Sequence, residues 1–278
     1  MPDFRFEFDR QLITLLFIQS APFFIIISVS ETLGLMDRII LSKLWSTDAV
    51  GIYTTGIMFI QLIYLIAPAI MNALFPGLSR TYISSSTRFS FLVSWIFKIM
   101  TVLIFPVMLL TIASSEWLIP FVFGSQYDSS ITVMQIAALG ILPSYLSRVL
   151  YRSILASDNE RAAVKATIIS GALSLLLNIL LIPTYGVVGA AIASVGTILA
   201  NLTQYFWHMT KIIRFDYKHA LLIPSICVVL SMITYILMIN WNHLAALAIA
   251  LIVFTIAVVV TKTINQEDIK MLMPSREK

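Results

Sequence analysis

Residues 88–112, RFSFLVSWIFKIMTVLIFPVMLLTI, decide the structural class of this chain. A helix of about 25 residues, at about 1.5 Å per residue, is long enough to cross the ~30 Å hydrocarbon core of a bilayer. Only Arg88 and Lys98 are charged within it. Comparable stretches recur throughout the 278 residues, whose mean hydropathy is +0.93 and of which only 12% are charged. The sequence therefore predicts an all-α, polytopic membrane helix bundle.

We predict about eight transmembrane helices. Their approximate limits are residues 12–42, 49–80, 88–112, 128–153, 162–183, 187–210, 219–239 and 243–262. Together they form a single transmembrane domain at 12–263. An aromatic, charged segment at 1–11 is expected to lie at the membrane surface before it. A tail follows at 264–278.

Lysine and arginine divide unevenly between the two sides of this predicted domain. If the N-terminus faces the cytoplasm, Lys43 alone lies in an opposite loop, while Arg38 and Lys98 fall within helices. The positive-inside rule then places both termini in the cytoplasm. The basic residues of the cytoplasmic side are Arg5, Arg10, Arg80, Arg88, Arg148, Arg152, Arg161, Lys165, Lys211, Arg214, Lys218, Lys262, Lys270, Arg276 and Lys278.

Several function classes find no support in the sequence. The basic pI near 9.2 does not indicate nucleic-acid binding, because the cations lie in short loops between apolar helices. Cys227 is the single cysteine, so neither a disulfide nor a CxxC metal site is expected within the chain. A membrane-embedded enzyme is disfavoured because His208, His219 and His243 have no carboxylate at the short spacing of an acyltransferase motif. We therefore predict no catalytic residues and no metal.

Four ionisable residues fall inside the predicted helices, where charge is costly and marks functional sites. Lys98 lies ten residues after Arg88, about 15 Å deep and close to the bilayer midplane. Glu31, Asp37 and Arg38 crowd one end of the first helix. An alternative for Asp37 and Arg38 is that both reach the outer headgroups.

Uncharged polar residues recur at helical spacing and predict a wet interior. Ser144, Arg148 and Arg152 recur every four residues and form a basic face, although the positive-inside bias alone also explains the two arginines. Asn178 stands among leucines, where a hydrogen bond between helices is the simpler explanation. Prolines inside predicted helices indicate kinks at Pro22, Pro68, Pro106, Pro143 and Pro224. The two polar stripes comprise Gln61, Tyr64, Pro68 and Asn72, and Thr197, Asn201, Gln204, Tyr205 and His208.

Five segments occur in an order that resembles the second lobe of bacterial oligosaccharide-lipid (O-antigen or polysaccharide) flippases. They are LGLMDRIIL at 33–41, DAVGIY at 48–53, ALFPGLSR at 73–80, FGSQY at 123–127 and NILLIPTYGVVGAAIA at 178–193. These flippases belong to the multidrug/oligosaccharidyl-lipid/polysaccharide exporter superfamily. The resemblance covers nearly the whole chain.

This resemblance implies the second lobe plus two extra C-terminal helices of a 14-helix transporter. The first lobe is missing, so the resemblance implies a fragment, a truncated gene product or a half that needs a partner. The implied function is to move polyprenyl-diphosphate-linked oligosaccharide repeat units outward across the bacterial cytoplasmic (inner) membrane by alternating access. Membrane lipids, the missing lobe and polysaccharide assembly proteins are the implied partners.

The resemblance also assigns roles to the polar residues. Lys98, Arg148 and Arg152 would attract the diphosphate, and Arg38 would do so nearer the outside. Glu31 or Asp37 would bind a coupling H⁺ or Na⁺, and no other cofactor is expected. The uncharged residues expected to bind the substrate are Gln61, Asn72, Asn201 and Gln204.

Two alternatives stay open at this point. One is a cation-coupled drug exporter of the same superfamily, which would favour an acidic, aromatic cavity over the mixed one predicted here. The other is a remnant that transports nothing.

Overall fold

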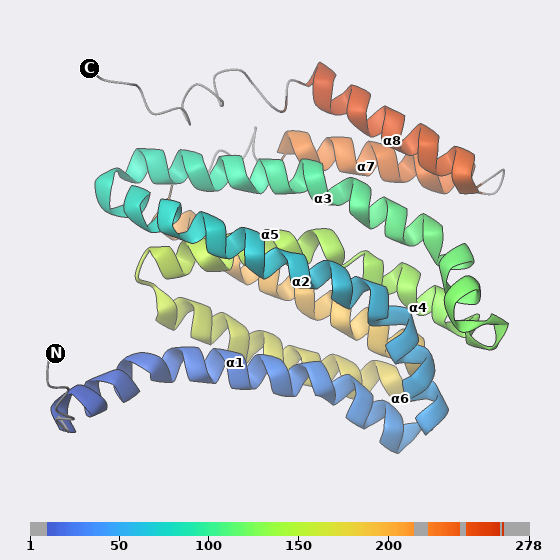
Figure 1. Cartoon of the computed structure of the whole chain (residues 1–278), viewed down its shortest axis with the longest axis horizontal. Coiled ribbons are helices and arrows are strands. Elements are labelled where there is room, and N and C mark those ends of the chain that lie inside the picture. Colours follow the sequence, from blue (N-terminus) through green and yellow to red (C-terminus); the bar gives the residue numbers. More distant parts are fainter. Residues whose placement is uncertain (1–9, 214–221, 240–242, 262, 264–278) are drawn as a thin grey trace, which may run out of the picture.

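The computed structural model describes residues 10–213, 222–239, 243–261 and 263, and all regular secondary structure in those ranges is helical (Figure 1). The chain is thus an all-α, polytopic membrane bundle, as predicted from the hydropathy. The helices are α1 (Arg10–Leu44), α2 (Thr47–Ser84), α3 (Ser86–Phe123), a 3-10 turn η1 (Ser125–Tyr127), α4 (Ser129–Ala138), α5 (Ile141–Ala156), α6 (Glu160–Ile212), α7 (Ile223–Met238) and α8 (His243–Val260).

Four apolar helical stretches are long enough to cross a membrane. They are α2, α3, the combined α4 and α5, and α6. Helices α7 and α8 are apolar but shorter. Helix α1 has 35 residues, a length of about 52 Å at 1.5 Å per residue.

Helix α6 is a hairpin rather than a rod. At Gly186 the backbone takes φ 57° and ψ −129°, outside the helical region, and the chain reverses there. The hydroxyls of Thr167 and Tyr205 lie 3.2 Å apart, and Gln204 Nε2 donates to Ser170 Oγ over 2.8 Å. The two limbs therefore run antiparallel, which confirms the predicted helices at 162–183 and 187–210.

The predicted helix at 128–153 is interrupted. Helix α4 ends at Ala138 and α5 begins at Ile141, with Leu139 and Gly140 between them. Pro143 lacks the N–H that would otherwise bond to the carbonyl of Leu139. Pro143 lies in the first turn of α5, where a missing N–H donor is tolerated. It therefore does not kink the interior of a longer helix.

The other four prolines at which kinks were predicted lie either inside a helix or at its start. Pro68 and Pro106 lie inside α2 and α3. Pro22 lies within α1. Pro224 occupies the start of α7, so the prediction of an internal kink was wrong there.

The helices pack in an order that places α5 at the centre. Helix α5 contacts α6 on one side and α2 and α3 on the other, while α1 packs mainly along α6 (Figure 1). Helices α7 and α8 pair with each other and lie against α3. Helices α3 and α5 contribute most of the main hydrophobic core, with Phe97, Phe105 and Tyr145 among its largest buried side chains.

The turns fall alternately at the two ends of the bundle. The α2–α3 and α5–α6 turns share one end, and the α1–α2 turn lies at the other (Figure 1). Arg80 and Arg88 flank the α2–α3 turn and Arg161 flanks the α5–α6 turn, as the topology prediction requires. The predicted tail and most of the predicted N-terminal segment lie outside the described residues, as do Arg5, Arg214, Lys218, Lys262, Lys270, Arg276 and Lys278.

Candidate functional site

A continuous polar groove runs between α1, α5 and the two limbs of α6. It consists of two cavities of about 230 and 210 Å³ that share Thr167, Ile198 and Asn201. We call it the polar groove. The first cavity is also lined by Ser144, Ser147, Arg148, Tyr151 and Tyr205, and the second by Gly34, Asp37, Ser170, Ser174, Asn178, Ser194 and Thr197.

The α6 hairpin supplies most of the groove, because polar residues recur on one face of each limb. The second limb contributes Ser194, Thr197, Asn201 and Tyr205, at spacings of three and four residues. Most of this stripe was predicted. The first limb contributes a matching stripe that sequence reasoning missed, although its spacing of three and four residues was a usable signal. That stripe is Thr167, Ser170, Ser174 and Asn178.

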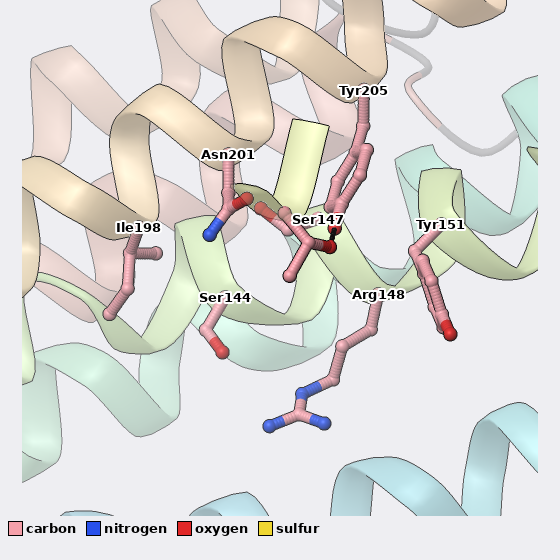
Figure 2. Close-up of a pocket in the computed structure, with 8 residues that line it drawn as sticks. Ser144, Ser147, Arg148, Tyr151, Ile198, Asn201 and Tyr205 are labelled. Atoms are coloured by element: carbon pink, nitrogen blue, oxygen red, sulfur yellow. Dashed lines mark hydrogen bonds between the residues drawn. The ribbon is translucent and has the colours of Figure 1, made fainter. Parts of the chain in front are cut away.

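Arg148 provides the positive charge of the groove. In Figure 2 its side chain extends from α5 away from the α6 side chains. The guanidinium carbon lies 5.9 Å from the centre of the Tyr64 ring on α2. Within the described chain, buried Nε of Arg148 and Oδ1 of Asn201 have no hydrogen-bond partner. Two residues that line the groove thus each carry a buried polar atom without a partner among the described residues.

Asp37 provides the negative charge at the other cavity. Its carboxylate accepts a hydrogen bond of 2.5 Å from the Tyr53 hydroxyl and one of 2.8 Å from the backbone N–H of Arg38. On the facing limb, Asn178 Nδ2 donates to the Ser174 carbonyl over 2.9 Å. Its Oδ1 is buried and has no partner among the described residues. The expected hydrogen bond from Asn178 to another helix is thus not what the structure describes.

Arg152 and Asn72, both predicted to contact substrate, contact each other. Arg152 Nη2 donates to Asn72 Oδ1 over 2.8 Å and so links α5 to α2. The guanidinium also lies 5.8 Å from the Phe75 ring centre and 6.0 Å from that of Tyr151. This pair lies one helical turn beyond Arg148 along α5.

Five other predicted residues do not line either cavity. Lys98 is 6% exposed within α3, which α5 separates from α6. Gln61 is exposed on α2, and Glu31 is exposed on α1. Arg38 is half-buried beside Asp37, and Gln204 is engaged with Ser170.

Comparisons with known proteins agree with this architecture. The family model for polysaccharide biosynthesis proteins matches residues 2–132. The probable low-salt glycan biosynthesis flippase of Haloferax volcanii is 26% identical over 188 residues, which cover 66% of this chain and 39% of the relative. An uncharacterized membrane protein of Methanocaldococcus jannaschii is 24% identical over 212 residues, covering 76% and 42%. The chain thus spans about two fifths of the length of these relatives.

Solved structures show the same fold. The lipid II flippase MurJ, in its inward closed conformation, superposes with a TM-score of 0.73 at 18% identity, covering 94% of this chain and 57% of that one. A transporter of the MOP superfamily from Pyrococcus furiosus gives 0.60 at 17% identity, covering 86% and 62%. An outward-facing multidrug resistance transporter of the MATE family gives 0.58 at 17%, covering 90% and 65%. The chain therefore shares the fold of these transporters.

Proposed function

We propose that this chain forms one lobe of a flippase that moves polyprenyl-diphosphate-linked oligosaccharide repeat units across the bacterial cytoplasmic membrane. The family match, the similarity to a glycan flippase and the polar groove support this function. Because the chain spans only part of its relatives, we also propose that a second lobe completes the transport pathway. The two lobes would expose their shared cavity to each side of the membrane in turn.

The polar groove is the observation that carries this proposal. Sugars and a diphosphate cannot enter hydrocarbon without losing their hydrogen bonds to water, so a transporter must replace those bonds. Hydroxyl and amide groups dominate the groove, with Arg148 and Asp37 as its charged members. Such a surface suits a neutral, hydroxyl-rich head group beside an anionic one. The prenyl tail would stay in the lipid between helices.

We assign the diphosphate contact first to Arg148, because this half-buried residue lines the groove and its Nε has no partner in the described structure. Arginine binds phosphate oxygens through paired donors. Arg152 would act one turn further toward the predicted cytoplasmic end, with Asn72 holding it in place. Asn201 and Gln204 would bind sugar hydroxyls. Lys98, Arg38 and Gln61 stay predictions for other stages of the transport cycle.

We propose that Asp37 binds the coupling ion, H⁺ or Na⁺. The cavity it lines also presents the unpartnered Oδ1 of Asn178 and the side-chain oxygens of Ser174, Ser194 and Thr197. Oxygen ligands of this kind suit a small hard cation, and a carboxylate also accepts a proton. Glu31 is less suited because it is exposed on α1.

The orientation follows from charge. Arg80, Arg88, Arg152 and Arg161 lie near helix ends at the same end of the bundle, and we place that end in the cytoplasm. Both termini would then be cytoplasmic, and the Gly186 reversal would lie at the outer face.

Glycan export in cells that depend on the complete gene tests the proposed function. The variant Arg148→Met should reduce surface glycan severely at normal protein abundance. Arg88→Gln, which removes a charge at the same end but outside the groove, should leave export unchanged. Normal export by the Arg148 variant would remove this residue from the substrate path. Normal glycan in a strain lacking the whole gene would overturn the function itself.

A drug exporter of the same superfamily is the second candidate. The likeness to the multidrug transporter structure and the aromatic residues Tyr151 and Tyr205 beside the groove favour it. Cationic dye efflux that depends on Asp37, without any effect on surface glycan, would select this candidate.

A further inference from the structure

We infer that the outer face of the α6 hairpin binds the headgroup of an anionic phospholipid, through Lys165, Lys211 and Trp207. This site is separate from the polar groove and does not rest on the proposed transport function. It lies at the open end of the hairpin, where the first limb begins and the second limb ends. We call these three residues the hairpin foot.

The register of the two limbs brings the hairpin foot together. Thr167 and Tyr205 are in hydrogen-bond contact across the limbs. Lys165 lies two residues before Thr167, and Trp207 lies two residues after Tyr205, so both are displaced by the same amount toward the open end. A shift of two residues turns a helix by about 200°, which directs Lys165 and Trp207 away from the groove that Thr167 and Tyr205 line.

The contacts around Trp207 tie the second limb into the same cluster. Lys211 Nζ lies 3.2 Å from the centre of the Trp207 ring, one helical turn away. His208 packs edge-on against Trp207, with ring centres 5.0 Å apart. Because Lys165 and Trp207 each lie two residues from the Thr167–Tyr205 contact, the lysines of the two limbs lie at the same end of the hairpin.

The clustered positive charges at this end of α6 favour the binding of an anion. Arg161 and Lys165 are exposed in the first two turns of α6, where the helix dipole is positive and cations are disfavoured. Lys211 adds a third positive charge from the other limb. Glu160 is the acidic residue in that first turn of the helix. A bound phosphate would offset the mutual repulsion of these cations.

The surface next to the hairpin foot fits the rest of a lipid molecule. Along the same outer face, toward the membrane interior, Ile168 is 48% exposed, Ile169 58% and Leu199 46%. Trp207, 57% exposed, lies between this apolar surface and Lys211, a position typical of tryptophan at the headgroup level. An acyl chain would lie on the isoleucines while its phosphate reaches the lysines. This continuity favours a membrane lipid over a free anion.

Native mass spectrometry of the full-length protein, purified and exposed to mixed phosphatidylglycerol and phosphatidylcholine, tests the inference. The unmodified protein should retain phosphatidylglycerol preferentially. The double variant Lys165→Gln/Lys211→Gln should lower that preference about thirtyfold, since each of the two basic residues near an anionic surface contributes about 1 kcal/mol. Trp207→Ala should weaken it as well.

The matched control is Arg80→Gln/Arg88→Gln, which removes the same charge from the α2–α3 turn at the same end of the bundle. It should keep the preference of the unmodified protein. Equal loss in the control would mean that only overall charge matters, and would overturn the site. An unchanged preference in the double variant would also overturn it. Displacement of the lipid by millimolar inorganic phosphate would show a free-anion site instead of a lipid site.

Discussion

The indole Nε1 of Trp45 donates a hydrogen bond of 3.0 Å to the backbone carbonyl of Ile182, a residue 137 positions later in the chain. Ile182 lies four residues before Gly186, whose non-helical backbone interrupts the helix of the first limb. A helical carbonyl at this position would normally accept from the N–H of residue 186. Trp45 therefore ties the α1–α2 turn to the first limb of the hairpin, one helical turn before the reversal.

Replacing this tryptophan should loosen the end of the bundle that holds the Gly186 reversal. Trp45→Phe keeps most of the apolar contact but removes the donor, and should lower the free energy of unfolding by about 1–2 kcal/mol. Thermal unfolding of the detergent-solubilised protein measures the change. Trp117→Phe, another exposed tryptophan, is the control and should have little effect. An unchanged melting temperature in the Trp45 variant would mean that water replaces the indole at no cost.

Gly186 is required for both its backbone and its space. Its φ of 57° disfavours any L-residue, and an added Cβ would lie 2.9 Å from the Trp45 ring. Gly186→Ala should therefore destabilise the protein by about 2 kcal/mol, as backbone strain at such positions does. Gly77→Ala is the control, because Gly77 is helical and has open space around it. Its stability should be unchanged or slightly higher.

A double variant separates the two effects at Gly186. In the Trp45→Ala background, the contact is gone but the backbone strain persists. Gly186→Ala should then cost less than it does in the unmodified protein. Equal costs in both backgrounds would assign the whole effect to the backbone.

Gly56 permits the close approach of α2 to α4. A Cβ there would lie 2.7 Å from Val133 Cβ and 2.9 Å from the Ser130 carbonyl. Gly56→Ala should force the helices apart and cost about 1–3 kcal/mol, as overpacking does. Gly51→Ala, one and a half turns earlier on an open face of the same helix, should cost nothing measurable. Similar unfolding temperatures for the two variants would contradict tight packing at Gly56.

Removing the charge of Asp37 should alter ion coupling without unfolding the protein. In the complete transporter, Asp37→Asn should keep normal abundance but lose at least tenfold in export rate, and the residual rate should no longer respond to the ion gradient. Uptake into inverted vesicles, with H⁺ or Na⁺ gradients imposed in turn, measures this. Glu31→Gln should behave as the unmodified protein. A reversed result for the two variants would move the ion site to Glu31.

The Arg152–Asn72 contact should be energetically coupled. Arg152→Gln and Asn72→Ala each break the same hydrogen bond, so the double variant should be less destabilised than the sum of the two single variants by about 0.5–1.5 kcal/mol. The same cycle between Arg152 and Gln61, which make no described contact, should be additive within about 0.5 kcal/mol. Additivity in both cycles would mean that solvent screens the Arg152 contact completely.

Hydropathy and charge predicted the helices and their alternation well, because both patterns are local to the sequence. The reversal near Gly186 was predicted to within a few residues, since Pro183 and Gly186 interrupt an otherwise apolar run. The polar stripe of the second limb was recognised because asparagine and glutamine are rare among apolar residues. The polar stripe of the first limb was missed because serine and threonine hydroxyls commonly donate hydrogen bonds to carbonyls of their own helix. Thr167 does so with the Ala163 carbonyl over 2.9 Å.

Which face of a helix meets which neighbour was beyond the sequence. The depth of Lys98 follows from its distance to Arg88, but its direction depends on how α3 is rotated against α5, α7 and α8. That rotation is set by packing between distant segments. The same argument applies to Glu31 and Gln61. Their side chains are polar, as a substrate or ion site requires, but both are exposed and neither lines the groove.

The tight reversal at Gly186 also has a consequence for biogenesis. On its own, the first limb would present Thr167, Ser170, Ser174 and Asn178 to the acyl chains on one side, which is unfavourable for a newly made segment. Only after about forty more residues have been synthesised does Tyr205 arrive opposite Thr167. We therefore expect the insertion machinery to retain the first limb until the second emerges, so that the hairpin enters the bilayer as one unit.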